Sequence, residues 1–274
     1  MSDAEELLYG RLLRHVRGLG RVVVAFSGGI DSTFLLQAVL DAGVDYLAVT
    51  ALSPTMPAQD RCDVEGLVAR MAVVHRFIAS GEMEDPQFVR NDANRCYYCK
   101  SDLFRRLTAL ARAEGYDCVL DGSTVDDGGD YRPGLRAKGE HGVGSPLWEV
   151  GLGKAEVRQL ARWKGLSNWD KPASPCLSSR ISYGEAIEPA SLRMVEGAER
   201  VLRVLGIRTL RVRKQGETAR IELLEEDIPR LLQAELRRQV TREIMALGFK
   251  YVTLDLEGFC SGKLNRVIAI NGGA

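Results

Sequence analysis

Several common features are scarce or missing in this sequence. Aromatic residues make up 7% of its 274 residues, there are three histidines, and 37 basic residues balance 37 acidic ones. The formal net charge of zero provides no overall field that would attract nucleic acid. No run of about 18 apolar residues occurs, and the N-terminus MSDAEELLYG lacks the pattern of a signal peptide. We therefore expect a cytoplasmic protein that binds neither a membrane nor nucleic acid.

Cysteine is also sparse, and its spacing is informative. The six cysteines are Cys62, Cys96, Cys99, Cys118, Cys176 and Cys260. In a cytosolic chain of this size we expect free thiols and no disulfide framework. Cys96 and Cys99 form a Cys-x-x-Cys pair, which could be a redox dithiol, half of a metal site or a coincidence. With no second pair and no nearby histidine, a four-ligand structural zinc site is not predicted.

Short apolar runs alternate with segments of helical length through the first 170 residues. The expected strands are 22–26, 45–52, 73–79 and 117–123, and the expected helices are 4–18, 33–43, 64–73, 101–115 and 151–165, with 80–100 irregular. This alternation predicts βαβ units, and hence an α/β fold with a doubly wound parallel sheet that helices cover on both faces.

The composition changes near residue 171. The stretch KPASPCLSSRISYGEAIEPA contains three prolines and many small residues, so we place a linker there. Beyond it we expect a helix, a hairpin, a long helical stretch and a last strand at 191–206, 207–224, 225–248 and 251–258. The predicted parts are a first domain at 1–170, a linker and active-site loop with Cys176 at 171–190, and a small α+β domain for substrate binding and oligomerisation at 191–274.

The apolar run VVVAF leads directly into SGGIDS at residues 27–32. A glycine-rich turn between a strand and a helix presents backbone N–H groups to an anion, and Gly28 and Gly29 would let the backbone approach a phosphate closely. Ser27 and Ser32 can donate hydroxyl hydrogen bonds, and Asp31 can orient them or bind Mg²⁺. On composition alone an ordinary turn is equally supported, while the Walker A and Rossmann patterns are absent.

SGGIDS matches the SGGxDS signature of the PP-loop ATP pyrophosphatases, which this chain resembles. The resemblance implies an adenine nucleotide alpha hydrolase-like fold and the Mg²⁺-dependent cleavage of ATP to AMP and pyrophosphate. It also implies nucleotide contacts from Thr50, Gly122, Asp126 and Lys154. Phosphate contact by Lys154 has independent support, because a lysine at a helix start is unfavourable unless it faces an anion. Asp121, Asp126 and Asp130, in LDGSTVDDGGDYRPG (120–134), could instead be solvated loop acids.

In PP-loop enzymes the adenylated group is attacked by ammonia or by sulfur, and the cysteines favour sulfur. Cys176 lies in SPCLSSR, flanked by proline and hydroxyl residues, with Arg180 four positions further on. A thiolate in an open setting near a cation is reactive, although an incidental loop cysteine is the alternative. Two cysteines from one loop and one from elsewhere would leave one iron of a [4Fe–4S] cluster open to sulfide.

Three further segments resemble one family. KPASPCLSSRISYG, RTLRVRKQGETARIEL and LGFKYVTLDLEGFCSGKLN are similar to the LarE family of ATP-dependent sulfur transferases, in the same order over nearly the whole chain. The resemblance implies adenylation of a carboxylate of pyridinium-3,5-biscarboxylic acid mononucleotide and its conversion to a thiocarboxylate. This step belongs to the synthesis of the nickel-pincer nucleotide of lactate racemase. The resemblance also implies a trimer-based homo-oligomer.

The same resemblance identifies Cys176 as the sulfur-delivering position. In one version of the family this cysteine gives up its sulfur and becomes dehydroalanine. In another version additional cysteines hold a [4Fe–4S] cluster that a donor supplies with sulfide. Because Cys96 and Cys99 accompany Cys176, we expect the cluster version, with all three as catalytic metal ligands. Tyr97 could stack on the pyridinium ring or pack as an apolar loop residue.

Charged residues of the second domain are candidates for substrate binding. Arg211 and Arg213 alternate on an expected strand and so face one side. Two such arginines repel each other unless they have an anionic partner, such as a substrate phosphate. Cross-strand ion pairs, with Glu222 on the next strand, are the equally supported alternative. The resemblance favours the phosphate and adds Arg180 and Glu199 to the substrate site.

Three other functions compete with this one. A tRNA thiolase shares the loop and the cysteines, but it requires a basic surface that the zero net charge does not support. An ammonia-dependent synthetase of the NAD or GMP type would leave the cysteines as bystanders. A nucleotide-binding sensor that never hydrolyses ATP would have no need of Asp31 or of the acids in 121–134.

Overall fold

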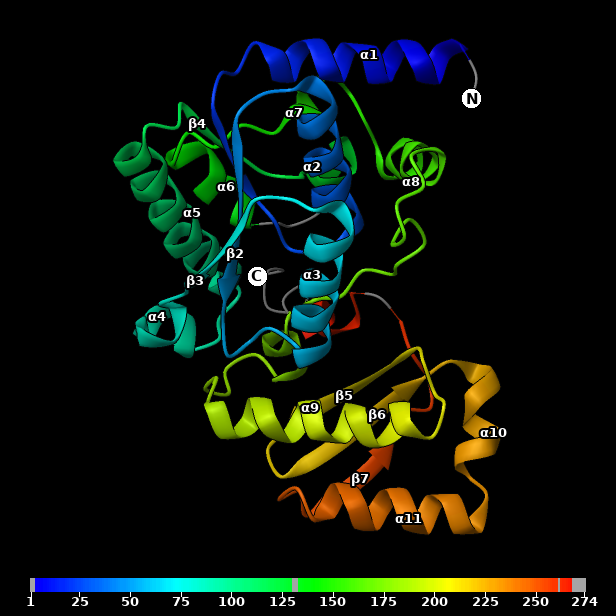
Figure 1. Cartoon of the computed structure of the whole chain (residues 1–274). Helices are drawn as coiled ribbons and strands as arrows, with labels where there is room; N and C mark the ends of the chain where they lie inside the picture. The colour runs from blue at the N-terminus through cyan, green and yellow to red at the C-terminus, as the bar shows by residue number, and fades with distance from the viewer. Residues whose placement is uncertain (1–2, 130–132, 261, 268–274) are drawn as a thin grey trace. The chain divides into compact units, whose positions relative to one another are not determined.

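The computed structural model of the chain describes residues 3–129, 133–260 and 262–267. The chain folds into two compact units (Figure 1), of which the first comprises Met1–Glu82 and Cys96–Ser174 and the second comprises Met83–Arg95 and Pro175–Ala274. The change of unit after Ser174 lies within the expected linker. The segment Met83–Arg95, by contrast, belongs to the second unit, although the sequence analysis placed it inside the first domain.

The first unit is built on a parallel sheet. Its strands are β1 (Val22–Ala25), β2 (Tyr46–Leu52), β3 (His75–Ala79) and β4 (Cys118–Leu120), in the order β3-β2-β1-β4. All three strand pairs are parallel, and β1 lies between β2 and β4. The valines of β1 favour this central place, because β-branched side chains pack well on a sheet that is buried on both faces. The predicted parallel sheet is confirmed.

Helices cover both faces of this sheet (Figure 1). One face packs on α1 (Asp3–Arg17), α2 (Ile30–Ala42), α3 (Ala58–Met71) and α8 (Lys154–Trp163), and the other on α5 (Arg95–Glu114) and α6 (Pro133–Glu140). Successive β1 residues alternate between the two cores, since Val22 and Val24 lie in the first and Val23 lies in the second. The fold is therefore doubly wound, as the sequence predicted.

Shorter elements fill the connections. They are η1 (Glu82–Glu84), α4 (Pro86–Val89), η2 (Val125–Gly129), α7 (Pro146–Glu149) and η3 (Leu177–Arg180). The expectation that 80–100 is irregular was wrong at its end, because α5 begins at Arg95. The Asp92 carboxylate accepts the Asn94 N–H at 2.7 Å just before this helix, in the manner of an Asx turn. Cys96 and Cys99 are consequently the second and fifth residues of a helix.

The second unit is an α+β structure. Its sheet has the order β5-β6-β7, in which β5 (Leu210–Gln215) and β6 (Thr218–Leu223) form the expected antiparallel hairpin and β7 (Tyr251–Leu254) pairs parallel to β6. The remaining elements are α9 (Pro189–Val204), η4 (Glu225–Asp227), α10 (Ile228–Leu231), α11 (Ala234–Met245) and η5 (Lys263–Asn265).

The long helical stretch expected at 225–248 is interrupted. Pro229 lies in the first turn of α10. Proline has no N–H to bond to a preceding turn, so a new helix begins there. Gln233 has a non-helical ψ of 133° and separates α10 from α11. In the ranges that the structure describes, no helix is long and apolar enough to cross a membrane.

Candidate functional site

The glycine-rich turn joins β1 to the start of α2. Gly28 has a φ of +71°, and a Cβ added there would lie 2.7 Å from a Val64 methyl group, so the position requires glycine. The Ser27 and Ser32 hydroxyls lie 3.1 Å apart, and the Thr33 hydroxyl donates to the Gly29 carbonyl at 2.8 Å. These hydrogen bonds hold the turn so that the N-terminus of α2, with its positive dipole end, stands behind it.

Gly122 brings the end of β4 against this turn. A Cβ at Gly122 would lie 2.8 Å from the Ser32 nitrogen and 2.9 Å from the Asp31 carbonyl carbon. Those atoms are backbone and cannot move aside as a flexible side chain would. Glycine is therefore required at Gly122 because two backbones meet there, whatever further contact the position makes with a nucleotide.

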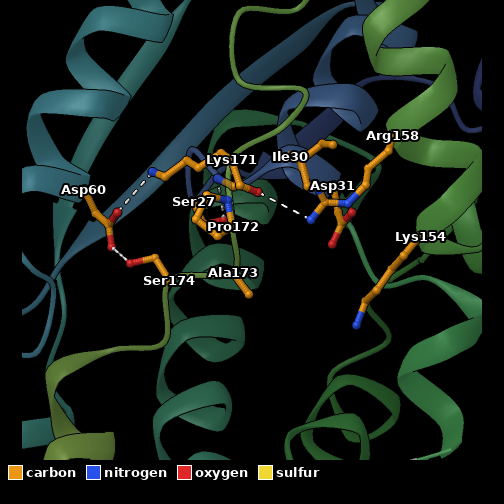
Figure 2. A pocket seen from close by; sticks show the side chains of 11 residues that line it. Ser27, Ile30, Asp31, Asp60, Lys154, Arg158, Lys171, Pro172, Ala173 and Ser174 are labelled. Atoms are coloured by element: carbon orange, nitrogen blue, oxygen red, sulfur yellow. Dashed lines mark hydrogen bonds and ion pairs between the residues drawn. The ribbon is translucent and has the colours of Figure 1, made fainter. Parts of the chain in front are cut away.

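A cavity of about 190 Å³ opens beside the turn (Figure 2). Its lining residues are Ser27, Gly29, Ile30, Asp31, Asp60, Lys154, Arg158, Lys171, Pro172, Ala173 and Ser174. Three cations, Lys154, Arg158 and Lys171, thus share a pocket with the candidate phosphate loop. Arg158 and Lys171 were not predicted from the sequence. The spacing of Arg158 from Lys154 was an available signal, because residues four apart lie on one helix face.

Lys154 lies at the first position of α8, and carboxylates surround it. Its ammonium pairs with Asp127 Oδ1 at 3.1 Å, while its backbone N–H donates to Asp126 Oδ2 at 2.5 Å. Asp126, the expected nucleotide ligand of this loop, thus accepts a hydrogen bond from the first backbone N–H of α8. Asp121 accepts hydrogen bonds from the Ser123 and Ser145 hydroxyls, and Asp130 lies outside the described residues.

Thr50 lies in β2 and is buried. Its hydroxyl donates to the Phe26 carbonyl at 2.6 Å and lies 2.8 Å from His75 Nε2. Since the hydroxyl has one proton, His75 donates the second hydrogen bond. Burial lowers the pKa of His75 below its ordinary value of 6.5, which is consistent with a neutral ring. The Thr50 side chain therefore links β1 to β3, and a nucleotide contact there would involve the backbone.

The paired cysteines and Tyr97 lie at the start of α5. Cys96 is exposed and Cys99 is half-buried. The Tyr97 hydroxyl donates to Glu140 at 2.6 Å, and the Arg136 guanidinium lies 3.8 Å from the centre of the Tyr97 ring. Cys176 belongs to the other unit. Across residues 3–129, 133–260 and 262–267, no three or more His, Cys, Asp or Glu side chains are gathered as a metal site.

Cys176 is half-buried and directly precedes η3. Arg180, which is 1% exposed, donates through Nη1 to the Pro175 and Cys176 carbonyls, at 2.5 and 3.1 Å. Its remaining nitrogens form a two-pronged ion pair with Glu199, at 2.8 and 3.2 Å. Burial alone would raise the pKa of Glu199, but Arg180 and Arg203 hold it below its ordinary value. Arg180 thus fixes the backbone that carries Cys176.

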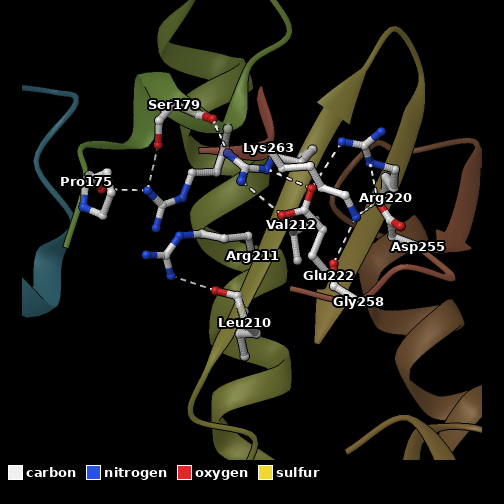
Figure 3. Close-up of polar contacts among 12 residues, drawn as sticks. Pro175, Ser179, Leu210, Arg211, Val212, Arg220, Glu222, Asp255, Gly258 and Lys263 are labelled. Atoms are coloured by element: carbon white, nitrogen blue, oxygen red, sulfur yellow. Dashed lines mark hydrogen bonds and ion pairs between the residues drawn. The ribbon is translucent and has the colours of Figure 1, made fainter. Parts of the chain in front are cut away.

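The neighbouring hairpin contains a second buried ion pair (Figure 3). Arg213 donates to both carboxylate oxygens of Glu222, at 3.1 and 2.9 Å, and also to the Ser179 carbonyl. Arg220 reaches the same carboxylate at 3.1 Å. Arg213 therefore pairs with Glu222 and also supports the segment that carries Cys176.

Arg211 is placed differently from Arg213. Its Nη1 donates to the Leu210 carbonyl at 2.7 Å, and its guanidinium lies 5.2 Å from the centre of the Phe259 ring. Burial, together with the positive charges of Arg180 and Arg213, lowers the pKa of Arg211 to about 10. Burial is the largest cause of this lowering, and Glu199 partly offsets the positive charge of Arg180 and Arg213, so an anion near Arg211 would balance the charge that remains.

Two buried residues that the sequence analysis did not single out also hold this region. Asn91 has a φ of +58°, and its amide donates to the Ser182 and Glu185 carbonyls at 2.8 and 3.0 Å. Arg95 donates to Asn91 Oδ1 at 2.6 Å and to the Ser178 carbonyl at 3.0 Å. Only the tertiary fold could identify them, because the carbonyls at 178–185 that they bind lie more than eighty positions away.

A glycine-rich turn after a central parallel strand, a helix N-terminus behind it and three cations beside it form a phosphate-binding site, and the sequence SGGIDS of its turn is that of a PP-loop nucleotide-binding enzyme. Comparison with known proteins narrows this class, although no family model matches the chain. An uncharacterised protein of Synechocystis is 44% identical over 251 residues, covering 91% of this chain and 94% of that protein. The pyridinium-3,5-bisthiocarboxylic acid mononucleotide synthase of Lactiplantibacillus plantarum is 40% identical over 256 residues, covering 93% of this chain and 92% of the synthase.

A more distant relative is the GMP synthase of Thermus thermophilus, which is 30% identical over 183 residues, or 59% of this chain and 35% of that enzyme. The chain belongs to the LarE family, to which the Lactiplantibacillus synthase belongs, and is an ATP-dependent PP-loop enzyme. The resemblance stated from the sequence is confirmed.

Proposed function

We propose that this protein converts a carboxylate of pyridinium-3,5-biscarboxylic acid mononucleotide to a thiocarboxylate, in the synthesis of a nickel-pincer nucleotide. The observation that carries the proposal is 40% identity to the Lactiplantibacillus synthase over nearly the whole of both chains. The PP-loop and Cys176 are the chemical features that this reaction needs.

The first step is adenylation. A substrate carboxylate oxygen attacks the α-phosphorus of ATP, and the bond to the β-phosphate oxygen breaks, so that pyrophosphate leaves. The backbone of 27–32 would hold the phosphates at the helix N-terminus, and Asp31 would bind Mg²⁺. Lys154 and Arg158 would neutralise the charge that develops on the departing pyrophosphate.

The second step delivers sulfur, and we propose that Cys96, Cys99 and Cys176 bind a [4Fe–4S] cluster. Cys96 and Cys99 suit this role because their spacing places two thiols in one helical turn. When bound by three thiolates, such a cluster has one iron that can accept sulfide from a donor. The alternative uses Cys176 itself: its sulfur attacks the acyl adenylate, AMP leaves, and loss of the Cα proton breaks the Cβ–S bond. The products are then a thiocarboxylate and dehydroalanine.

The substrate phosphate would bind in the second unit near Arg211. The lowered pKa of Arg211, caused by burial and by Arg180 and Arg213, supports this placement because an anion would relieve the repulsion. Arg180, Arg213, Glu199 and Glu222 would support the site and the Cys176 segment. We further propose that Tyr97 contacts the substrate ring and that the second unit assembles the protein into a trimer-based oligomer.

One experiment tests both the function and the sulfur route. The wild type and Cys176→Ala are incubated with Mg·ATP and the dicarboxylate nucleotide, and AMP, thiocarboxylate and protein mass are measured together with bound iron. We expect Cys176→Ala to release pyrophosphate in the adenylation step and to retain AMP on the substrate as the acyl adenylate, but to form less than about a hundredth of the thiocarboxylate. Cys260→Ala, which changes an exposed cysteine of the same unit, should behave as the wild type.

The possible outcomes separate the alternatives. Iron bound by the wild type after anaerobic reconstitution, and lost in Cys96→Ala, supports the cluster. An iron-free wild type whose mass falls by about 34 Da, one H₂S, after turnover establishes the consumed cysteine instead. Full thiocarboxylate formation by Cys176→Ala would contradict the sulfur role of Cys176 in both versions.

A further inference from the structure

We infer that Lys171 is a pyrophosphate-binding residue, which Asp60 and Asp63 hold beside the pocket until ATP is bound. The inference rests on the ATP use described above and assigns a residue and a control to it. Lys171 lines the same pocket as Ser27, Lys154 and Arg158. In Figure 2 its side chain points to Asp60, on the far side of Ser27 from Lys154.

The side chain of Lys171 has two carboxylate partners on α3. Its ammonium lies 3.0 Å from Asp60 Oδ1 and 2.7 Å from Asp63 Oδ2. Burial alone would lower the pKa of Lys171, but hydrogen bonds and charge from Asp63 and Asp60 raise it above the ordinary 10.5. Lys171 therefore remains charged throughout the physiological range, as phosphate binding requires.

Both carboxylates keep a second partner if the ammonium leaves. Asp60 Oδ2 accepts the Ser174 hydroxyl at 2.7 Å, and Asp63 Oδ1 accepts the Gln59 amide at 2.8 Å. Arg70 also contributes positive charge near Asp63. Because neither carboxylate would be left without a hydrogen bond, exchanging the lysine carries a smaller penalty than breaking an isolated ion pair.

The backbone of Lys171 stays close to the pocket during such an exchange. Its N–H donates to the Asn168 carbonyl at 3.0 Å, and its carbonyl accepts Arg158 Nη2 at 3.5 Å. Asn168 in turn donates to the Gly28 carbonyl and the Thr33 hydroxyl, at 3.2 and 3.0 Å. With its backbone tied to the phosphate loop, the flexible four-carbon side chain needs only rotamer changes to turn from α3 to a phosphate.

The charges that line the pocket explain why a lysine held by Asp60 and Asp63 would be useful. Asp31 and Asp60 place two negative charges at the pocket, whereas Lys154, Arg158 and Lys171 place three positive charges there. Pyrophosphate brings several negative charges that can compete with Asp60 and Asp63 for the ammonium, whereas AMP lacks the β- and γ-phosphates. Lys171 should therefore discriminate between pyrophosphate-bearing and pyrophosphate-free ligands.

The test measures binding of magnesium pyrophosphate and of AMP to the full chain by calorimetric titration. We expect Lys171→Met to weaken pyrophosphate binding about tenfold or more, the loss of one charged hydrogen bond, with AMP binding changed less than about twofold. Lys171→Arg should retain most of the affinity. Asp60→Asn should strengthen pyrophosphate binding about threefold, and this gain should vanish in Asp60→Asn/Lys171→Met.

Lys164→Met is the matched control, because Lys164 is about as buried as Lys171 and pairs with Asp41 but does not line the pocket. The Lys164→Met variant should bind pyrophosphate as tightly as the wild type does. Wild-type pyrophosphate affinity in a folded Lys171→Met, or a gain in Asp60→Asn that persists without Lys171, overturns the inference. A wild type that binds neither ligand contradicts nucleotide use itself, and the inference with it.

Discussion

At the residue scale, buried carboxylates hold the arginines of the second unit. The residue pattern left a substrate phosphate and cross-strand ion pairs as equal alternatives for Arg211 and Arg213, and the resemblance favoured the phosphate. Arg180 with Glu199, and Arg213 with Glu222, are nearly or fully inaccessible pairs, and both arginines also bind carbonyls at 175–179. Breaking such a pair leaves one buried charge without compensation, which destabilises far more than the loss of an exposed pair.

Replacing Glu199 with glutamine should therefore make the second unit less stable to unfolding. Glu199 accepts hydrogen bonds from Arg180, Arg203 and the Val212 N–H. We expect Glu199→Gln to lower the free energy of unfolding by about 3 kcal/mol in urea titrations. Glu235→Gln, at an exposed position of α11, should leave it almost unchanged. Equal stability of the two variants would show that the Arg180 pair contributes nothing net.

At the scale of elements, strands and most helices follow local patterns, and the exceptions have local causes. The apolar runs predicted four parallel strands because β-branched residues in short segments favour a sheet buried on both faces. The start of α5 was misplaced because 80–100 was expected to be irregular, whereas the Asp92 carboxylate accepts the Asn94 N–H in a turn that leads directly into the helix. The 225–248 stretch was expected to be one helix, but Pro229 and the extended Gln233 divide it.

Contact between β4 and the phosphate loop provides an element-scale prediction. Gly122→Ala would place a methyl group 2.8 Å from the Ser32 nitrogen, and such overpacking destabilises proteins by about 1–3 kcal/mol. We expect the displaced loop to bind AMP at least about tenfold more weakly, a loss of about 1.4 kcal/mol. Gly139→Ala is the control, because no atom lies within 4 Å of a Cβ there. It should stabilise α6 slightly, and a parallel loss of AMP binding in both variants would refute the steric argument.

At the scale of the whole molecule, the pH dependence of stability should depend partly on His75. Burial lowers its pKa below 6.5 in the folded state, so the unfolded chain binds more protons between that lowered pKa and the unfolded value. Stability therefore falls as the pH falls through this window, by at most about 1.4 kcal/mol per pH unit from this group. The contribution is fully present above the unfolded pKa.

Urea titrations at pH 7.5 and pH 5.5 measure this effect. We expect the wild type to lose more stability between the two values than His75→Gln, which can still donate to the Thr50 hydroxyl but does not titrate. Identical losses in the two proteins would show that His75 does not contribute to the pH dependence.

The sequence by itself determined the class of fold, the position of the phosphate loop and membership of the LarE family. These properties depend on local apolar periodicity and on contiguous motifs such as SGGIDS, so neighbouring residues are sufficient to specify them. The tertiary structure decided which charges meet. Lys171 lies 111 positions from Asp60, and Asn91 lies 91 positions from Ser182. No local pattern encodes such pairs, because chain folding alone brings distant segments within hydrogen-bonding distance.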